Sequence, residues 1–348
     1  MRILIVTPLQ PEATGNGVTS LRYRKEMEAR GYRVRLVMTD EEDPAPLQEA
    51  LDQFRPDLVH LLHAYRSGRP WLECAPHSAI PFVVTLTGTD IHQGMDSPAQ
   101  GSVIRQVLER ADAVITQNRL TFAELKGRTA SWIEHLRYLP PSIVLGTDPF
   151  PLRQLHGIPS NHVLFLHPAG IRQVKGNLEM LRLFDAVATE RSDLTVVFCG
   201  PILEEEYGRQ FLSELAERPW SRYLGTVPPA AMAAALKESD VVLNNSSCEG
   251  LSNVLVEASV LGRPLLVRNI SGNAALASLA GLAPSAATGA GRLQHLLVSF
   301  NPVLVDMAGL ATSCRPAGRT SSTTSRSRPI RHWPVSTAWS ASAAPAAV

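Results

Sequence analysis

Two acidic residues, Glu249 and Glu257, lie eight positions apart in the segment VVLNNSSCEGLSNVLVEASVLG, which is otherwise uncharged and rich in small and apolar residues. The residue pattern predicts a strand over 240–246, a loop, and a helix over 253–262. Glu249 is then expected in a loop at the carboxyl edge of a sheet, and Glu257 about one turn inside the helix. Carboxylates in such positions can accept hydrogen bonds from the hydroxyls of a sugar.

The start of this helix adds an anion-binding element between the two carboxylates. Ser252 or Asn253 can cap the helix, and the backbone amides of a first helical turn attract phosphate groups. A carboxylate, a set of amides and a second carboxylate suit a sugar, a diphosphate and a ribose, so the segment predicts a nucleotide-sugar site. The alternative, a solvated helix after an ordinary loop acid, explains poorly why Glu257 has Val, Leu and Ala around it. The donor-binding residues predicted in this segment are Gly250, Leu251, Ser252, Asn253 and Glu257.

A basic loop, GIRQVKGN at 170–177, follows the strand predicted at 162–170, where the phosphate-binding turn of a nucleotide fold lies. Arg172 and Lys175 are three positions apart in this loop, with a glycine on each side. Two cations there can bracket a diphosphate and offset the charge of a leaving group. The alternative is a surface loop with ordinary basic residues.

A glycine-containing loop, TGNGVTS at 14–20, follows the first strand of the chain. Gly15, Asn16 and Gly17 would let the backbone approach a bound donor closely. The spacing differs from GxGxxG, and no acidic residue ends the second predicted strand as a ribose ligand would. An NAD oxidoreductase therefore has weak support, and a plain glycine-rich turn stays open as the alternative.

Polar residues also stand at the ends of two strands in the first half of the chain. His63 lies near the end of the strand at 57–64, and Asp90 follows the strand at 81–88. Either one could act as a base toward an acceptor hydroxyl, although a histidine at a strand end is more commonly a hydrogen-bonded structural residue. The sequence has no DxD, HExxH, GxSxG or P-loop motif. It therefore contains no motif for a catalytic nucleophile, and we expect neither a metal site nor a cofactor.

Alternating strands and helices position these residues and predict two parallel α/β domains. A first domain is expected at 1–140, with strands at 2–8, 32–38, 57–64, 81–88 and 112–118 and helices at 19–30, 47–55 and 102–111. A Pro-rich passage predicts a linker at 141–160. A second domain is expected at 161–275, with strands at 162–170, 194–200, 222–227, 240–246 and 264–269 and helices at 177–191, 203–218, 230–239 and 253–262. Such a pair of domains forms a cleft between the carboxyl ends of its two sheets.

Composition narrows the range of partners. The 348 residues carry a net charge of +1, which gives no electrostatic support for nucleic acid or an anionic membrane as a partner. No run approaches the roughly 18 apolar residues of a transmembrane helix, and MRILIVTPLQ predicts a buried strand rather than a signal peptide. Four cysteines without a CxxC pair or a regular framework indicate a reducing, cytoplasmic location.

The last part of the chain differs from the rest. After position 275 the sequence holds six Arg, no Lys, no Glu and one acidic residue, Asp306. The stretch 316–348 is rich in Ser, Thr, Ala, Arg and Pro and has no helical or strand period. Such a composition does not easily build a core, so we expect a disordered, low-complexity tail at 276–348. Our hypothesis is that this tail is an out-of-frame or replaced terminus.

Together these features resemble the GT-B glycosyltransferases of the large retaining family 4, the glycosyl transferases group 1. The resemblance is carried by the E-x7-E pair Glu249 and Glu257, by Arg172 with Lys175, and by the glycine loop at 15–17. More narrowly, the chain is similar to the glycosyltransferase 1 domain-containing protein 1 group in GNGVTSLR, LHAYRSGR, IPFVVTLTGTD, GIRQVKGN, NSSCEGLSNVLVEA and RNISGNAAL. The similarity runs from residue 1 to about 275.

The resemblance implies a two-domain enzyme of the hexosyltransferase type that moves a sugar from a nucleotide donor, such as a UDP- or GDP-sugar, to an acceptor that the sequence does not name. It implies retention at the anomeric carbon without a bound metal. By position, Glu257 would bind the donor's ribose, and Glu249 would contact the transferred sugar. Arg172 and Lys175 would stabilise the diphosphate, and the donor phosphate itself can accept the acceptor's proton.

Two departures from the family pattern leave alternatives open. Thr87 stands where many members have the histidine of an HGxD motif, and the sequence after about 275 does not match the family. One alternative is a nucleotide-sugar-binding protein that lost activity with its C-terminal elements. Another is a glycosyltransferase related to selenosugar synthases, whose acceptor would be selenophosphate.

Overall fold

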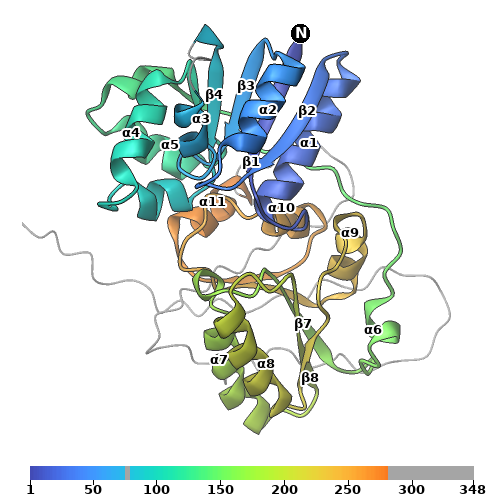
Figure 1. The fold of residues 1–348 in the computed structure, drawn as a ribbon. Coiled ribbons are helices and arrows are strands. Elements are labelled where there is room, and N and C mark those ends of the chain that lie inside the picture. Colours follow the sequence, from blue (N-terminus) through green and yellow to red (C-terminus); the bar gives the residue numbers. More distant parts are fainter. Residues whose placement is uncertain (75–78, 281–348) are drawn as a thin grey trace, which may run out of the picture.

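Short runs of β-branched and apolar residues form two separate parallel sheets in the computed structural model, which describes residues 1–74 and 79–280 (Figure 1). Six strands of the N-terminal domain pair in the order β2-β1-β3-β4-β5-β6. Five strands of the C-terminal domain pair in the order β11-β10-β7-β8-β9. Every pair of neighbouring strands is parallel, which confirms the predicted class of two α/β domains.

The N-terminal domain alternates strands and helices up to β6. Its strands are β1 (Arg2–Pro8), β2 (Arg33–Thr39), β3 (Leu58–Leu62), β4 (Phe82–Leu86), β5 (Ala113–Thr116) and β6 (Leu136–Tyr138). Its α-helices are α1 (Gly15–Ala29), α2 (Ala45–Phe54), α3 (Gly68–Glu73), α4 (Gly101–Arg110) and α5 (Arg119–Lys126). A π-helical turn, η2 (Asp90–Gly94), follows β4, and a 3-10 helix, η3 (Ser131–His135), precedes β6.

The C-terminal domain repeats the alternation after a connecting segment that contains the short helix α6 (Leu152–Leu155). Its strands are β7 (Val163–Pro168), β8 (Leu194–Cys199), β9 (Ser221–Tyr223), β10 (Val241–Asn244) and β11 (Leu265–Val267). Its helices are η4 (Gln173–Lys175), α7 (Asn177–Glu190), α8 (Glu205–Ala216), α9 (Pro229–Glu238), α10 (Asn253–Val260) and α11 (Ser271–Ala280). Helix α11 crosses the boundary expected at 275, and the rest of the predicted tail lies outside the described residues.

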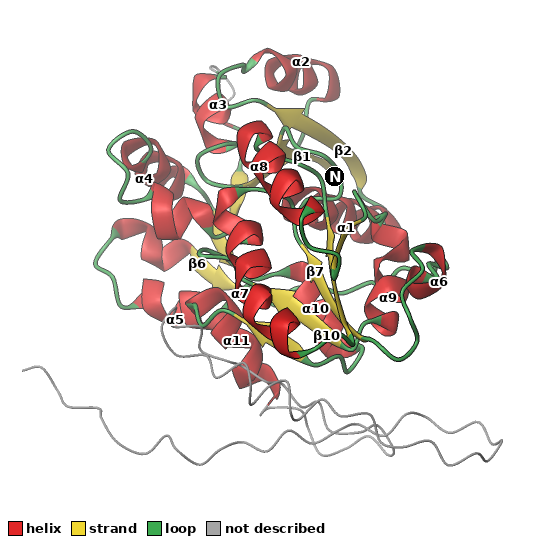
Figure 2. Ribbon diagram, turned by 90° about the horizontal axis from the view of Figure 1, so that it is seen from below, coloured by secondary structure: helices red, strands yellow, loops and turns green. Residues whose placement is uncertain are grey.

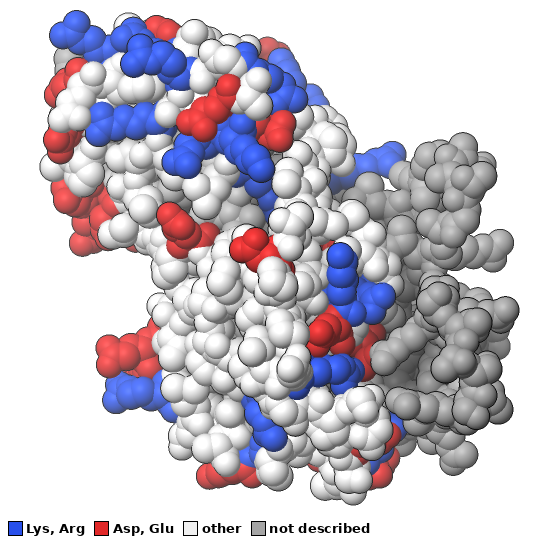
Figure 3. Space-filling view, turned by 90° about the vertical axis from the view of Figure 1, so that its right-hand side faces the viewer, with Lys and Arg blue, Asp and Glu red and all other residues white. Residues whose placement is uncertain are grey.

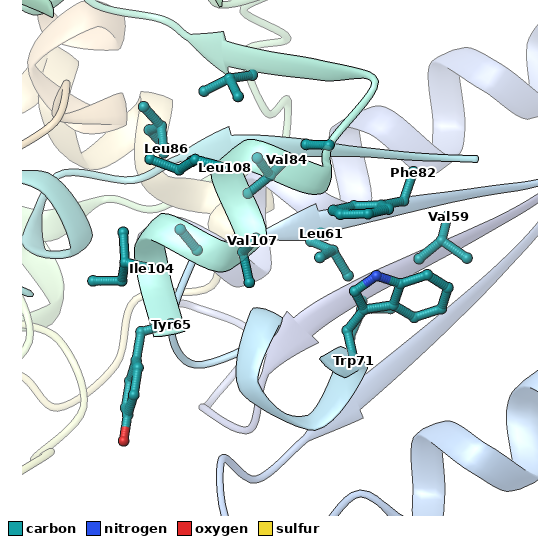
Figure 4. Close-up of a cluster of buried hydrophobic side chains, with 14 of the residues drawn as sticks. Val59, Leu61, Tyr65, Trp71, Phe82, Val84, Leu86, Ile104, Val107 and Leu108 are labelled. Carbon is teal, nitrogen blue, oxygen red and sulfur yellow. The ribbon is translucent and has the colours of Figure 1, made fainter. Parts of the chain in front are cut away.

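Apolar side chains from both faces of the N-terminal sheet are buried, as expected for parallel strands covered by helices. Figure 4 shows Trp71 of α3 and Phe82 of β4 beside Leu61 of β3, with the two aromatic ring centroids 5.4 Å apart. Ile104 and Val107 of α4 pack on the same cluster and are fully buried. This packing fixes the ends of β3 and β4, which carry His63 and the loop around Gly88.

The first helix begins earlier than the sequence indicated. We expected a loop through residues 14–20 and a helix from about Thr19, but α1 begins at Gly15. The hydroxyl of Thr14 accepts a hydrogen bond from the backbone nitrogen of Gly17 at 3.4 Å, which is an N-cap. The glycines therefore form the first turn of a helix rather than a loop.

The two domains meet through backbone contacts and paired helices. Helices α5 and α11, from different domains, lie side by side (Figure 2). Gly88, in the loop after β4, packs so closely on Gly250 of the other domain that a Cβ on Gly88 would overlap the Gly250 backbone nitrogen. A Cβ on Gly250 would lie 2.7 Å from the carbonyl oxygen of Thr87. Docking of the domains here therefore depends on two residues without side chains.

Exposed charges are mixed in sign on the surface that Figure 3 displays, where basic and acidic side chains alternate over the N-terminal domain. On α1, for example, Arg30 pairs with Glu26 at 2.9 Å and Arg24 with Glu28 at 3.9 Å. Such exposed pairs contribute little to stability. Within the described ranges, none of the helices has the length and apolar character that crossing a bilayer requires.

We predict that Gly88→Ala separates the domains. Gly88 has a φ of +113°, which an alanine adopts only with strain, and the added Cβ would push against the Gly250 backbone. The free energy of unfolding should fall by more than the about 1–2 kcal/mol that a positive φ costs a non-glycine residue. The radius of gyration from small-angle X-ray scattering should rise as well.

Gly31→Ala is the matched control, because Gly31 also has a positive φ, +82°, but a Cβ there would meet nothing within 4 Å. It should lower stability without changing the scattering. Equal effects of the two substitutions on both measurements would show that the Gly88 contact does not hold the domains together.

Candidate active site

A cleft of about 210 Å³ lies between the two domains, at the carboxyl ends of strands from both sheets. Ligands of doubly wound folds bind at this edge. The N-terminal domain lines the cleft with the start of α1 and the residues after β3, β4 and β5. The C-terminal domain contributes the loops after β7, β8 and β10, residues after β9 and at the start of α9, and three residues of α10, namely Asn253, Val254 and Glu257. The cleft thus brings together residues from the predicted loops at 14–20, 170–177 and 249–253.

Glu249 lies on the cleft wall just after β10 and forms an ion pair with Lys175. The same carboxylate oxygen, Oε1, accepts hydrogen bonds from the hydroxyl of Ser246 at 2.7 Å and from the amide of Asn244 at 3.4 Å. Burial opposes ionisation of Glu249, but Lys175 and these hydrogen bonds outweigh it and lower the carboxyl pKa below its usual value. The site therefore holds an ionised carboxylate beside a lysine.

Glu257 lies in the second turn of α10, and its carboxylate pairs with Arg22 of α1. Only 7% of Glu257 is exposed. Burial raises the pKa of this carboxyl, and Arg22 opposes the shift. Both glutamates that the sequence singled out thus line the same cleft, each with a basic partner.

Arg172 also lines the cleft but has no acidic partner of its own within the described residues. Its Nε is buried without a hydrogen-bond partner there. Burial lowers the pKa of the guanidinium, and Glu249 acts in the opposite direction. Arg172 precedes the short η4 helix that carries Lys175, and its backbone nitrogen donates to Asn177 Oδ1 at 3.2 Å. An uncompensated cation at this place attracts an anionic ligand.

The glycine turn reaches the cleft only in part. Gly15 and Asn16 line it, whereas Gly17 does not. A Cβ on Gly17 would overlap the carbonyl oxygen of Glu12, so Gly17 is required by packing within its own domain. The structure therefore does not bring Gly17 to the donor cleft as the sequence led us to expect.

The start of α10 reaches the cleft with all four residues predicted there. Gly250, Leu251, Ser252 and Asn253 line the cleft. Ser252 occupies the N-cap position, but no side chain caps the helix. The backbone amides of the first turn are therefore not engaged by the side chain of the N-cap residue.

His63 is held in a strained conformation, with a φ of +84°, and is only 4% exposed. Its Nδ1 accepts hydrogen bonds from the backbone nitrogens of Tyr65 at 3.2 Å and Arg66 at 3.1 Å. The hydrogen-bond pattern then assigns the proton to Nε2, which donates to the Thr89 hydroxyl at 3.0 Å. Burial lowers the pKa of His63, so the ring is neutral and both nitrogens are occupied. The geometry fits a residue that shapes the loop after β3 better than a base.

Asp90 lies behind the cleft wall and is fully buried. Its carboxylate accepts hydrogen bonds from three backbone nitrogens, those of Ala64 at 3.0 Å, Thr87 at 3.1 Å and Gly88 at 2.9 Å. These bonds tie the end of β3 to the end of β4 and fix the loop that meets Gly250. Asp90 therefore holds the backbone of these two loops in place. It does not line the cleft, so its carboxylate is out of reach of an acceptor bound there.

Two residues that form hydrogen bonds across the domain boundary beside the cleft were not singled out from the sequence. Asn118 caps α5 with its Oδ1, which accepts from Leu120 at 2.9 Å, while its Nδ2 donates across the domain boundary to the Gly250 carbonyl at 2.6 Å. An Asn between a strand and a helix is a capping signal that would have found it. Arg22 is one of several basic residues on α1, and nothing in the sequence distinguishes its contact with the other domain.

The described residues contain no group of three or more His, Cys, Asp or Glu side chains arranged to hold a metal ion. The cleft is lined by Arg172, by the Lys175–Glu249 ion pair and by Glu257, whose carboxylate pairs with Arg22. This arrangement suits an anionic ligand that carries hydroxyl groups.

Comparisons with known proteins identify glycosyltransferase sequences in both domains. Residues 150–280 match the family model for glycosyl transferases group 1, and residues 41–142 match the model for the glycosyl transferase 4-like domain. The glycosyltransferase 1 domain-containing protein 1 of Xenopus tropicalis is 25% identical over 284 residues, which cover 79% of this chain and 81% of the relative.

Solved structures share the fold. Anabaena Alr3699/HepE, solved in complex with UDP and glucose, aligns with a TM-score of 0.62 at 18% identity, covering 86% of each chain. Sucrose-phosphate synthase from Thermosynechococcus elongatus aligns with a TM-score of 0.66 at 15% identity, covering 90% of this chain and 88% of the other. With its two facing α/β domains and these two family matches, the chain is a GT-B glycosyltransferase whose residues 150–280 match the glycosyl transferases group 1 family.

Proposed function

We propose that this enzyme transfers a sugar from a nucleotide-sugar donor with retention of the anomeric configuration and without a metal ion or other cofactor. The observation that carries the proposal is the unpaired cation of Arg172 beside the Lys175–Glu249 ion pair, in a cleft that Glu257 also lines. A nucleoside diphosphate supplies the negative charge that this cleft lacks. A UDP- or GDP-sugar is the proposed donor, and Alr3699/HepE was solved with UDP-glucose.

In the proposed reaction, an acceptor hydroxyl forms a bond to the anomeric carbon while the bond from that carbon to the diphosphate oxygen breaks. The hydroxyl proton passes to the departing phosphate oxygen on the same face of the sugar. Arg172 and Lys175 offset the charge that develops on the diphosphate. Glu249 accepts hydrogen bonds from the transferred sugar, and Glu257 accepts them from the ribose.

This assignment gives His63 and Asp90 supporting roles. His63 shapes the loop after β3, and Asp90 fixes the loop after β4, so both set the N-terminal wall of the cleft. No protein base is required, because the leaving phosphate accepts the proton. We also propose a cytoplasmic location, where nucleotide sugars are supplied.

We predict that a screen of UDP-, GDP- and ADP-sugars raises the melting temperature of the protein with one base in preference to the others. A ligand that binds the native state at 100 times its Kd adds about 2.7 kcal/mol of stability. Glu257→Ala and Lys175→Ala should abolish the shift, measured against each variant's own melting temperature.

Glu205→Ala and Lys237→Ala are matched controls, since both residues are exposed and lie outside the cleft. They should keep the shift. If both cleft variants kept it as well, the donor site would lie elsewhere. Binding without release of the nucleoside diphosphate would favour a nucleotide-sugar-binding protein without turnover.

We predict retention in a reaction with methanol as the acceptor. A methyl glycoside does not change its anomeric configuration in water, so proton NMR can read the stereochemistry of the product directly. A donor with an α-linked sugar should give the α-methyl glycoside, and the rate should be unchanged by EDTA. A β-linked product would overturn the proposed stereochemistry, and loss of activity in EDTA that added metal restores would overturn metal independence.

A further inference from the structure

The N-terminal domain reaches into the donor site through one face of α1. Gly15, Thr19 and Arg22 are spaced so that they share this face, and Asn253 and Glu257 share a face of α10. The Asn253 amide donates to the Gly15 carbonyl at 3.1 Å and to the Thr19 hydroxyl at 3.0 Å. Figure 1 places α10 directly below the end of α1.

Arg22 makes the charged contact of this seam. One of its terminal nitrogens, Nη1, donates to Asn253 Oδ1 at 3.3 Å, and the other, Nη2, donates to Glu257 Oε1. The side chains of Arg22 and Glu257 are 13% and 9% exposed. Both groups are therefore largely removed from water, where an ion left without its partner is strongly unfavourable.

The two oxygens of the Glu257 carboxylate differ in their hydrogen bonding. Arg22 occupies Oε1, and no hydrogen bond to Oε2 is found within the described residues. Glu257 nevertheless lines the cleft. Oε2 is thus the oxygen left to accept a hydrogen bond from a ligand.

We propose that Arg22 is a positioning residue that orients Glu257 toward the ribose hydroxyls of the donor, so that donor binding depends on docking of the N-terminal domain. The inference rests on the proposed function, because it takes Glu257 as the ribose ligand. Coupling of this kind is reciprocal, so a bound nucleotide also strengthens the docking of the two domains.

The test compares nucleotides with and without ribose hydroxyls. Calorimetry measures the Kd of UDP and of 2′,3′-dideoxy-UDP, with GDP and its dideoxy form in parallel, for the full-length protein and for Arg22→Met. The native protein should prefer the hydroxylated nucleotide by roughly 10- to 100-fold, the range for a hydrogen bond to a charged group. Arg22→Met should reduce this preference to less than about threefold and leave the Kd of the dideoxy nucleotide nearly unchanged.

Control variants separate positioning from a general loss of structure. Arg24→Met alters a neighbouring arginine with 45% side-chain exposure and should keep the full preference. Arg22→Lys keeps a cation beside Glu257 and should restore part of it. Glu257→Gln should lose the preference, and adding Arg22→Met to it should cause little further loss.

The outcomes distinguish the two proposals. If the native protein prefers the hydroxylated nucleotide and Arg22→Met keeps that preference, the role of Arg22 is wrong while the donor site stands. If Arg22→Met weakens both nucleotides equally, its role is structural and the inference is likewise overturned. If the native protein binds neither UDP nor GDP, the proposed donor site fails.

Discussion

Negative charge buried at the boundary of two domains is the constraint on which the site depends. Glu249 and Glu257 are both largely removed from water, and an isolated buried carboxylate is strongly unfavourable. Lys175 forms an ion pair with Glu249 within the C-terminal domain, and Arg22 of the N-terminal domain forms one with Glu257. The charge on one wall of the cleft is therefore balanced only when the domains are docked.

The two sheets make this balance possible because they face each other with their carboxyl ends. Asp90 ties together the loops after β3 and β4, and Asn118 links the start of α5 to the Gly250 carbonyl. The close contact of Gly88 with Gly250 lets these loops meet without side chains between them. Arg172 is left beside the Lys175–Glu249 pair with no acidic partner in the described residues, so the arrangement is complete only with an anion present.

Much of this could be predicted from the sequence, because parallel strands are short β-branched runs and their ends collect functional loops. The positions of Glu249, Glu257, Arg172 and Lys175 at one cleft follow from this rule. Contacts between domains could not be predicted in the same way. Arg22 lies on a helix with several basic residues, and which of them faces α10 is decided by docking.

Local geometry accounts for the other differences. The sequence does not distinguish a glycine that contacts a ligand from one that packs on a carbonyl, as Gly17 does on Glu12. His63 and Asp90 have the chemistry of a base, but their hydrogen bonds to backbone nitrogens occupy them. The three residues of β6 are too few to form a recognisable pattern beside a Pro-rich segment.

A crystal structure of the protein with a bound nucleoside diphosphate would test the central claim most directly. The diphosphate should lie against Arg172 and Lys175, with the ribose hydroxyls at Oε2 of Glu257 and Arg22 still paired to Oε1. A nucleotide bound away from the two glutamates, or a ribose that displaces Arg22 from Glu257, would contradict this arrangement.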